Sequence, residues 1–360
     1  MPNTKRYSYE PNYITRPGEV LEAYLAARGM TQAELAQRCG RPTKTISEIV
    51  HGKAAITPDT ALQLGRVLGQ SAALWQGLEA NYRLGLAKRS ENESFANESD
   101  WARRFPIREL VRRGCIEDTD NVAERVRQLL AFFGVGTIAG WRSRFGEMQP
   151  SYRRSPKFEA SVEALSAWLR LGELEAENVS CAHFDRAAFL ARLQDARALT
   201  LRPFPIARQK LVESFAAAGV AIVFVPELPK THLSGAARWL TKDKALIQLS
   251  LRYKRADHLW FTVFHEAGHI VLHGKKQVFV DDHDGTESAE EEEANRFAQD
   301  LLIPSTAFQK FRREGVFTRD AVLRFAGACG IAPGVVVGRL QHEKLIPYSR
   351  HHDLLEPISE

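Results

Sequence analysis

The stretch DHLWFTVFHEAGHIVLHGK, residues 257–275, decides the fold of the C-terminal third of the chain. Its apolar residues recur at the spacing of a helix, as at Leu259 and Val263. Because positions i and i+4 of a helix lie one above the other, His265 and His269 can bind one cation together. The stretch therefore predicts a helix that presents two imidazoles to Zn²⁺.

Glu266 follows the first of these histidines and is expected to lie beside the cation rather than to bind it. From there a carboxylate can take a proton from an attacking water and pass it to a leaving amine. This is the chemistry of zinc-dependent peptide hydrolysis. Two surface histidines at helical spacing are the alternative interpretation of the same short pattern.

A third metal ligand is expected in ESAEEEEANRFAQDLLIP, residues 287–304. A catalytic zinc site needs three protein ligands and one open position for water. Glu290 and Glu291 both fall near the apolar face of the predicted helix, and periodicity does not choose between them. His273 lies about 12 Å along the helix from His265. We expect it to favour the helix C-terminus rather than to bind the same ion.

A second pattern lies in GMTQAELAQRCGRPTKTISEIVHGKAAIT, residues 29–57. Thr31 can cap a first helix from Gln32 to Arg38, and Gly40 supplies a tight turn. A second helix is predicted from Thr43 to Val50. This pattern is typical of a helix-turn-helix, whose second helix enters the major groove of DNA.

The candidate DNA contacts lie near the starts of these two helices. Helical spacing leaves Thr43, Lys44, Thr45 and Ser47 on the outer side of the second helix, where such proteins reach base edges. Gln32 is expected to contact a phosphate or to support the base contacts. A module used only for dimerisation or toxin contact is the alternative.

The charge distribution favours a nucleic-acid partner for the N-terminal quarter. The chain has a net charge of +5, and residues 1–90 hold 12 Lys and Arg against 7 Asp and Glu. The remaining 270 residues hold 37 charges of each sign, so all the excess lies in one small segment. An excess positive charge of this size is also found on protein surfaces that contact only solvent.

The chain has no apolar leader and no stretch of about eighteen apolar residues, so we expect neither export nor membrane insertion. The four cysteines stand far apart, without the CxxC spacing of a metal site. They suit a reducing cytoplasm. These features predict a cytoplasmic protein.

Residues 31–69, TQAELAQRCGRPTKTISEIVHGKAAITPDTALQLGRVLG, resemble the Cro/CI-type (XRE) repressor domain in the version found in HigA-type antitoxins. The resemblance covers roughly the first quarter of the chain. It implies binding to operator DNA and a homodimer on paired half-sites. It also implies a place in a toxin–antitoxin circuit.

FTVFHEAGHIVLHGK followed by EEEEANRFAQDLLIP resembles the ImmA/IrrE family of metallo-endopeptidases. That family places its third zinc ligand three residues before the Ala of its E-x-x-A-N-x-F-A run, which is Glu291 in this chain. The resemblance thus implies a Zn²⁺ site made of His265, His269 and Glu291, with Glu266 as the catalytic base.

Together the patterns predict an α+β protein that is mostly helical. We expect an all-α helix-turn-helix domain at residues 1–90 and a linker and helical spacer at 91–203, with 86–101 as the best linker candidate. A zincin-like metallopeptidase domain with a small β-sheet is expected at 204–348. Residues 349–360 are expected to form a C-terminal tail. The sheet should contain the strand VAIVFVPEL and a hairpin made of GAARWL and ALIQLSL.

The function that follows is a bacterial DNA-binding transcriptional regulator with a zinc-dependent endopeptidase domain. The resemblance implies that the peptidase cleaves a partner repressor or antitoxin-type protein. The alternative is a non-enzymatic, antitoxin-like repressor whose zincin fold serves ligand sensing or toxin docking. A purely structural zinc is less favoured, because structural sites usually close all four positions with protein ligands.

Overall fold

Helices and one small β-sheet make up the part of the chain that the computed structural model describes, which comprises residues 14–146, 161–229, 231, 233–252, 254–274, 279–281 and 288–358. The chain divides into two units. The first extends to Ser99 and includes Thr119–Arg127, and the second comprises Asp100–Asp118 and the chain from Gln128 onward. The predicted α+β fold, mostly helical, is confirmed.

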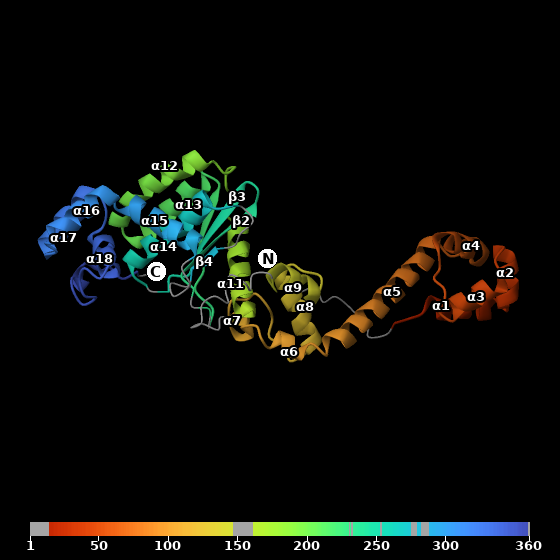
Figure 1. Ribbon diagram of the computed structural model, residues 1–360. Helices are drawn as coiled ribbons and strands as arrows, with labels where there is room; N and C mark the ends of the chain where they lie inside the picture. The colour runs from red at the N-terminus through yellow and green to blue at the C-terminus, as the bar shows by residue number, and fades with distance from the viewer. Residues whose placement is uncertain are drawn as a thin grey trace, which may run out of the picture. The chain divides into compact units, whose positions relative to one another are not determined.

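The first unit is a helical bundle around a small apolar core. Figure 1 shows the short helices of this unit gathered together, with the longer α5 extending from them. Its buried side chains come from every helix of the bundle and include Leu21, Leu35, Ile46, Leu64 and Trp75. The helices are α1 (Pro17–Arg28), α2 (Gln32–Cys39), α3 (Thr43–Val50), α4 (Pro58–Leu68) and α5 (Ala72–Phe95).

The helix-turn-helix forms with the predicted caps. The Thr31 hydroxyl accepts a hydrogen bond from the backbone N–H of Glu34 at 3.1 Å. Gly40 ends α2 with a φ of 63°, a left-handed conformation that costs glycine little. The second helix begins at Thr43 and ends at Val50, as predicted.

The polar stretch at 86–101 differs from the expected linker. Helix α5 continues through it to Phe95, and the short α6 (Ser99–Ala102) follows. Charge pairs at helical spacing replace apolar periodicity here, as in the 3.1 Å ion pair between Arg89 and Glu93. An exposed helix of this kind has no apolar stripe for sequence analysis to detect.

The middle of the chain is helical, as predicted, but its last two helices are more than a spacer. The Trp168 indole N–H of α11 donates to the Val225 carbonyl at 3.0 Å. Phe189 and Leu193 of α12 are fully buried in the core that also contains the sheet. The helices are α7 (Ile107–Arg112), α8 (Val122–Phe133), α9 (Ile138–Gly146), α11 (Val162–Glu177) and α12 (Arg186–Ala196).

The second unit contains one four-stranded sheet with the order β1-β3-β2-β4. Strand β1 pairs parallel with β3, while β2 pairs antiparallel with both β3 and β4. The first strand and the hairpin are those predicted, whereas β4 was not predicted. The strands are β1 (Val220–Phe224), β2 (Gly235–Thr241), β3 (Lys244–Leu249) and β4 (Phe279–Asp281).

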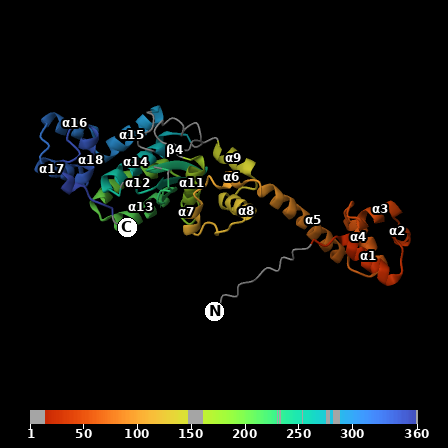
Figure 2. The same cartoon turned by 90° about the horizontal axis from the view of Figure 1, so that it is seen from below.

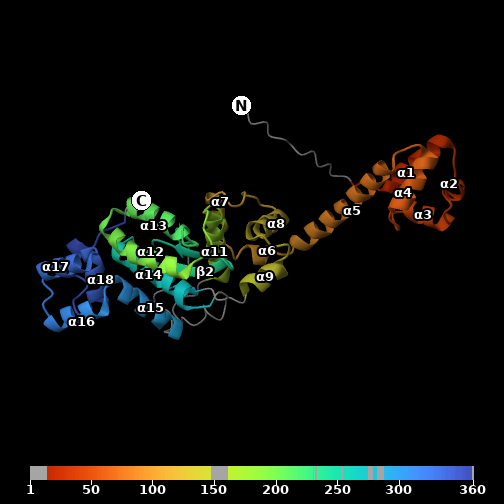
Figure 3. The ribbon, with the colours of Figure 1, turned by 90° about the horizontal axis from the view of Figure 1, so that it is seen from above.

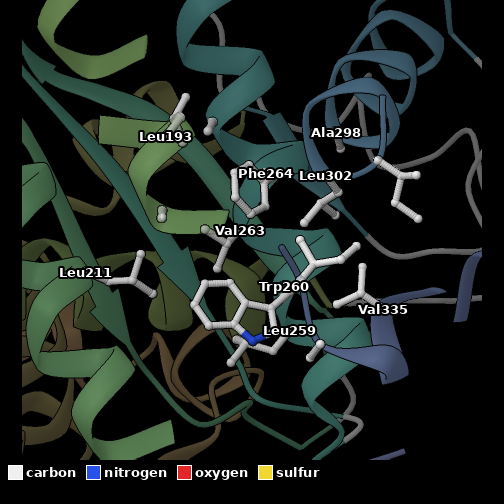
Figure 4. Close-up of a cluster of buried hydrophobic side chains, with 14 of the residues drawn as sticks. Leu193, Leu211, Leu259, Trp260, Val263, Phe264, Ala298, Leu302 and Val335 are labelled. Carbon is white, nitrogen blue, oxygen red and sulfur yellow. The ribbon is translucent and has the colours of Figure 1, made fainter. Parts of the chain in front are cut away.

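Helices cover both faces of this sheet. Along β3, Ile247 and its alternate neighbours join the core with α13 (Phe204–Ala216) and α14 (Ala256–Leu272). Gln248 lies on the opposite face, where its amide donates to the Trp168 carbonyl of α11 at 2.7 Å. The core side chains in Figure 4 include Leu193, Leu211, Leu259, Trp260, Val263, Phe264, Ala298, Leu302 and Val335.

The remaining helices complete this unit beyond α14. In Figures 2 and 3, α16, α17 and α18 lie together, and α18 contacts α14. Within the described residues, no single helix is long and apolar enough to cross a membrane; only α17 and α18 taken together, across a bend of 113°, meet that test. The elements are η1 (Arg197–Leu201), α15 (Ala289–Leu302), α16 (Ser305–Glu314), α17 (Arg319–Cys329), α18 (Pro333–His342) and η2 (His352–Leu354).

The expected C-terminal tail packs against the second unit instead of leaving it. Pro357 pairs with Arg255 in a short antiparallel bridge. The backbone N–H of Ile358 donates to the Lys254 carbonyl at 2.8 Å, and the Ile358 side chain is buried in the core. Apolar residues near the end of the chain bring it back to the start of α14.

Candidate metal centre and nucleic-acid interface

Helix α14 carries the predicted HExxH residues in the interior of the second unit. His265, Glu266 and His269 are all buried. The helix is apolar on most of its circumference and is therefore covered by the sheet on one side and by α15 on another. Since polar side chains are buried only where partners compensate them, these three residues need specific partners.

Glu291 of α15 meets both histidines. Its carboxylate oxygens lie 3.1 Å from His265 Nε2 and 3.5 Å from His269 Nε2, and the two Nε2 atoms are 3.0 Å apart. The ligand atoms of all three residues lie within 4.8 Å of one another. Glu290, which periodicity left equally possible, is not part of this group.

The outer nitrogens of the two rings also have partners, which sequence analysis missed. His265 Nδ1 lies 3.0 Å from Asn295 Oδ1, and His269 Nδ1 lies 3.0 Å from His273 Nδ1. Both partners stand four residues after a member of the metal group, Asn295 after Glu291 and His273 after His269. This i+4 spacing was the available signal.

Electrostatics favour a charged Glu291 carboxylate beside a neutral His269 imidazole. Burial alone would raise the pKa of the Glu291 carboxyl, but hydrogen bonds with His265 and His269 outweigh it and hold that pKa well below its usual value. Burial lowers the pKa of His269, and its contact with Glu291 opposes this only in part. Deprotonated imidazole and carboxylate are the forms that bind a metal.

This donor set fits zinc. Two imidazole nitrogens and one carboxylate oxygen are the ligands of many catalytic zinc sites, which keep a fourth position for water or substrate. Each imidazole also has a hydrogen-bond partner on its far nitrogen, as metal-bound histidines almost always do. The residues present can therefore hold Zn²⁺.

The Glu266 side chain lies against strand β2. It is 0% exposed. A Cβ placed at Gly235 would lie 2.4 Å from Glu266 Oε1 and 2.8 Å from Thr262 Cγ2. Glycine at position 235 thus leaves room for the Glu266 carboxylate. No sequence pattern predicted this close approach of β2 to α14.

The candidate DNA contacts lie on α2 and α3 of the first unit. Thr43 and Lys44 are exposed at the start of α3, and Thr45 and Ser47 are half-buried. The Lys44 side chain is 85% exposed and makes a loose ion pair with Glu48 at 3.8 Å. Gln32 is half-buried at the first position of α2.

His51 is an additional polar residue near this surface. It follows α3, is exposed, and its Nδ1 lies 2.7 Å from the Ser47 carbonyl oxygen. The ring therefore stays close to the last turn of the helix.

Two family models match the chain. The model described as the IrrE N-terminal-like domain matches residues 221–340, which run from β1 to α18. A helix-turn-helix model matches residues 21–75, which run from α1 to the start of α5.

The similar curated proteins all match a part of about one fifth of the chain. YddM of Escherichia coli, an uncharacterised HTH-type transcriptional regulator, is 30% identical over 79 residues, which are 22% of this chain and 84% of that protein. Virulence-associated protein I of Dichelobacter nodosus is 37% identical over 76 residues, which are 21% of this chain and 70% of that protein.

Solved structures of HigA-type antitoxins are also similar to part of the chain. The antitoxin HigA of Pseudomonas aeruginosa with the higBA promoter has 29% identity and a TM-score of 0.23, covering 24% of this chain and 95% of its own. An addiction module antidote protein of the HigA family from Coxiella burnetii has 29% identity and a TM-score of 0.22, covering 24% and 94%.

Proposed function

Because the chain belongs to the family of helix-turn-helix transcriptional regulators and joins that domain to an IrrE N-terminal-like domain, we propose that it binds operator DNA and cleaves a partner protein at a zinc site. The observation that carries the enzymatic half is the convergence of His265, His269 and Glu291 within 4.8 Å. Glu266 lies next to the first ligand on the same helix. The substrate is a repressor or antitoxin-type protein.

The residues divide the chemistry among themselves. His265, His269 and Glu291 hold the ion, and a bound Zn²⁺ supplies a Lewis acid for the scissile carbonyl. Glu266 takes a proton from the attacking water and gives it to the amine that leaves when the peptide bond breaks. Burial of His265, Glu266 and His269 strengthens the electrostatic interactions of these side chains.

The first unit binds the operator DNA. Exposed Thr43 and Lys44 at the start of α3 are suited to base edges, and Gln32 at the start of α2 is suited to a phosphate. A homodimer would present two such helices to paired half-sites. We place the protein in the cytoplasm, where its free cysteines stay reduced.

One observation favours a second, non-enzymatic function. Glu266 is 0% exposed, so a substrate peptide reaches this carboxylate only if the site opens. In that case the protein is an antitoxin-like repressor, and its zincin fold senses a ligand or docks a toxin.

Metal content tests the site directly. The purified full chain should hold about one Zn²⁺, and His265→Ala or Glu291→Ala should lose it because a ligand is removed. Glu290→Ala is the matched control, since it deletes the neighbouring carboxylate and should keep the metal. Wild-type protein without zinc by elemental analysis would exclude the metallopeptidase.

Cleavage tests the reaction. The protein and its Glu266→Gln variant are incubated with candidate repressors encoded by neighbouring genes, and the products are analysed by mass spectrometry. Glu266→Gln should keep zinc but release no fragment, because the base is lost. If neither protein releases a fragment and both regulate alike in cells, the non-enzymatic function holds.

A further inference from the structure

A hydrogen-bonded chain runs from the candidate metal centre to the surface. His269 Nδ1 lies 3.0 Å from His273 Nδ1, and His273 Nε2 lies 3.2 Å from Glu293 Oε2. We propose that His273, itself held by Glu293, is a positioning residue that fixes His269 as an Nε2 ligand. This inference rests on the zinc site of the proposed function.

Metal binding through His269 Nε2 leaves one arrangement of protons along this chain. If His269 binds through Nε2, its Nδ1 must carry the proton and donate it to His273 Nδ1. His273 Nδ1 is then an acceptor, so its proton sits on Nε2 and is donated to the Glu293 carboxylate. Each contact thus has one donor and one acceptor, and the far carboxylate selects the tautomer of the ligand.

Ring packing holds the same two imidazoles in place. Phe279 stacks on His269 with ring centroids 4.2 Å apart and planes 15° apart, and its ring also lies 5.0 Å from that of His273. The His273 side chain is only 6% exposed, while that of Glu293 is 57% exposed. The chain of contacts is therefore enclosed at His273 and meets solvent only at its last member.

The two histidine ligands are supported differently. His265 faces a neutral amide oxygen of Asn295, whereas His269 faces an imidazole backed by a carboxylate. A carboxylate behind a ligating imidazole raises its basicity as well as orienting it. His269 should therefore be the more strongly supported ligand.

Two substitutions at position 273 separate hydrogen bonding from packing. His273→Phe keeps a ring against Phe279 but removes the acceptor that faces His269 Nδ1. His273→Asn loses the ring but can place an amide oxygen where Nδ1 was. Glu293→Gln removes the charge at the far end, and Glu292→Gln changes the exposed neighbour as the matched control.

The measurement is zinc affinity of the full chain, by competition with a chelator. We expect His273→Phe to weaken binding about 10- to 100-fold, the usual effect of losing an outer partner of a ligand. His273→Asn should bind more tightly than His273→Phe, Glu293→Gln should lie between wild type and His273→Phe, and Glu292→Gln should match wild type. Metal-free samples are compared by thermal unfolding, so that a folding defect is recognised.

The relative zinc affinities of His273→Phe and His273→Asn test the inference even if both variants are less stable than wild type. Wild-type affinity in His273→Phe, or weaker binding in His273→Asn than in His273→Phe, overturns it and leaves the zinc site standing. Absence of zinc binding by wild type overturns this inference and the metallopeptidase together.

Discussion

Gly235 has only a hydrogen atom at the position where any other residue has a Cβ, and a Cβ there would contact Glu266. The three atoms nearest to a Cβ built there belong to Glu266 and Thr262, at 2.4 to 2.9 Å. Such distances require that a side chain or the backbone shift. At the residue scale, the position of the candidate base therefore depends on a missing side chain in β2.

Gly235→Ala should separate metal binding from proton transfer. The new methyl group displaces the Glu266 carboxylate, and the three atoms nearest to it belong to Glu266 and Thr262. Cleavage of the partner should therefore fall about tenfold or more while zinc is retained. Initial cleavage rates and zinc content measure the two effects.

Gly327→Ala is the matched control for this substitution. A Cβ at Gly327, on α17 of the same unit, meets nothing within 4 Å. Its cleavage rate should equal that of wild type. Unchanged cleavage in Gly235→Ala as well would mean that Glu266 does not act from the position described.

At the scale of elements, the helix-turn-helix follows local rules. Thr31 caps α2, Gly40 ends it, and Ile46 and Ile49 bury the inner face of α3. The outer face of α3 then starts with Thr43 and Lys44. Because these choices are local, the sequence predicts both helices closely.

Lys44→Ala combined with Thr45→Ala should weaken DNA binding. The pair removes one charge and one hydroxyl from the start of α3, so affinity for operator DNA selected by the wild-type protein should fall about tenfold or more at matched salt. The salt dependence should also become shallower if Lys44 contacts a phosphate. Fluorescence anisotropy at several salt concentrations measures both.

Lys210→Ala removes the same charge from an exposed position of α13 in the second unit and serves as the control. It should bind DNA like wild type. Equal binding by the double variant and this control would make the helix-turn-helix a protein-contact module.

At the scale of the whole molecule, distant segments complete the core around the candidate metal centre. Phe189 and Leu193 come from α12, and Leu355 and Ile358 from the end of the chain. Trp168 of α11 binds the Val225 carbonyl directly after β1. The domain predicted at 204–348 would lack these five side chains.

A fragment of residues 204–348 should therefore fail to fold, while a fragment of residues 100–358 should fold and bind zinc. Losing one buried Phe or Leu side chain costs about 2–5 kcal/mol, and a domain is stable by only about 5–15 kcal/mol in total. Circular dichroism and zinc content of the two fragments check this. A cooperative unfolding transition in the shorter fragment would restore the narrower domain bounds.

The amino-acid sequence by itself determined the parts of this protein that depend on neighbours along the chain. Helical spacing placed His265 and His269 on one face, and caps and turns placed α2 and α3. The same spacing did not distinguish Glu290 from Glu291 as the third zinc ligand, and only the resemblance to the ImmA/IrrE family favoured Glu291. Periodicity and capping are local, so they can be read from a short stretch.

Only the tertiary structure decided which residues from separate elements meet. It brought Glu291 and Asn295 of α15 to the histidines of α14, and Gly235 of β2 to Glu266. It also turned the expected spacer and tail into parts of the core. These contacts depend on how helices pack on a sheet, which follows from burial of the whole surface rather than from any local pattern.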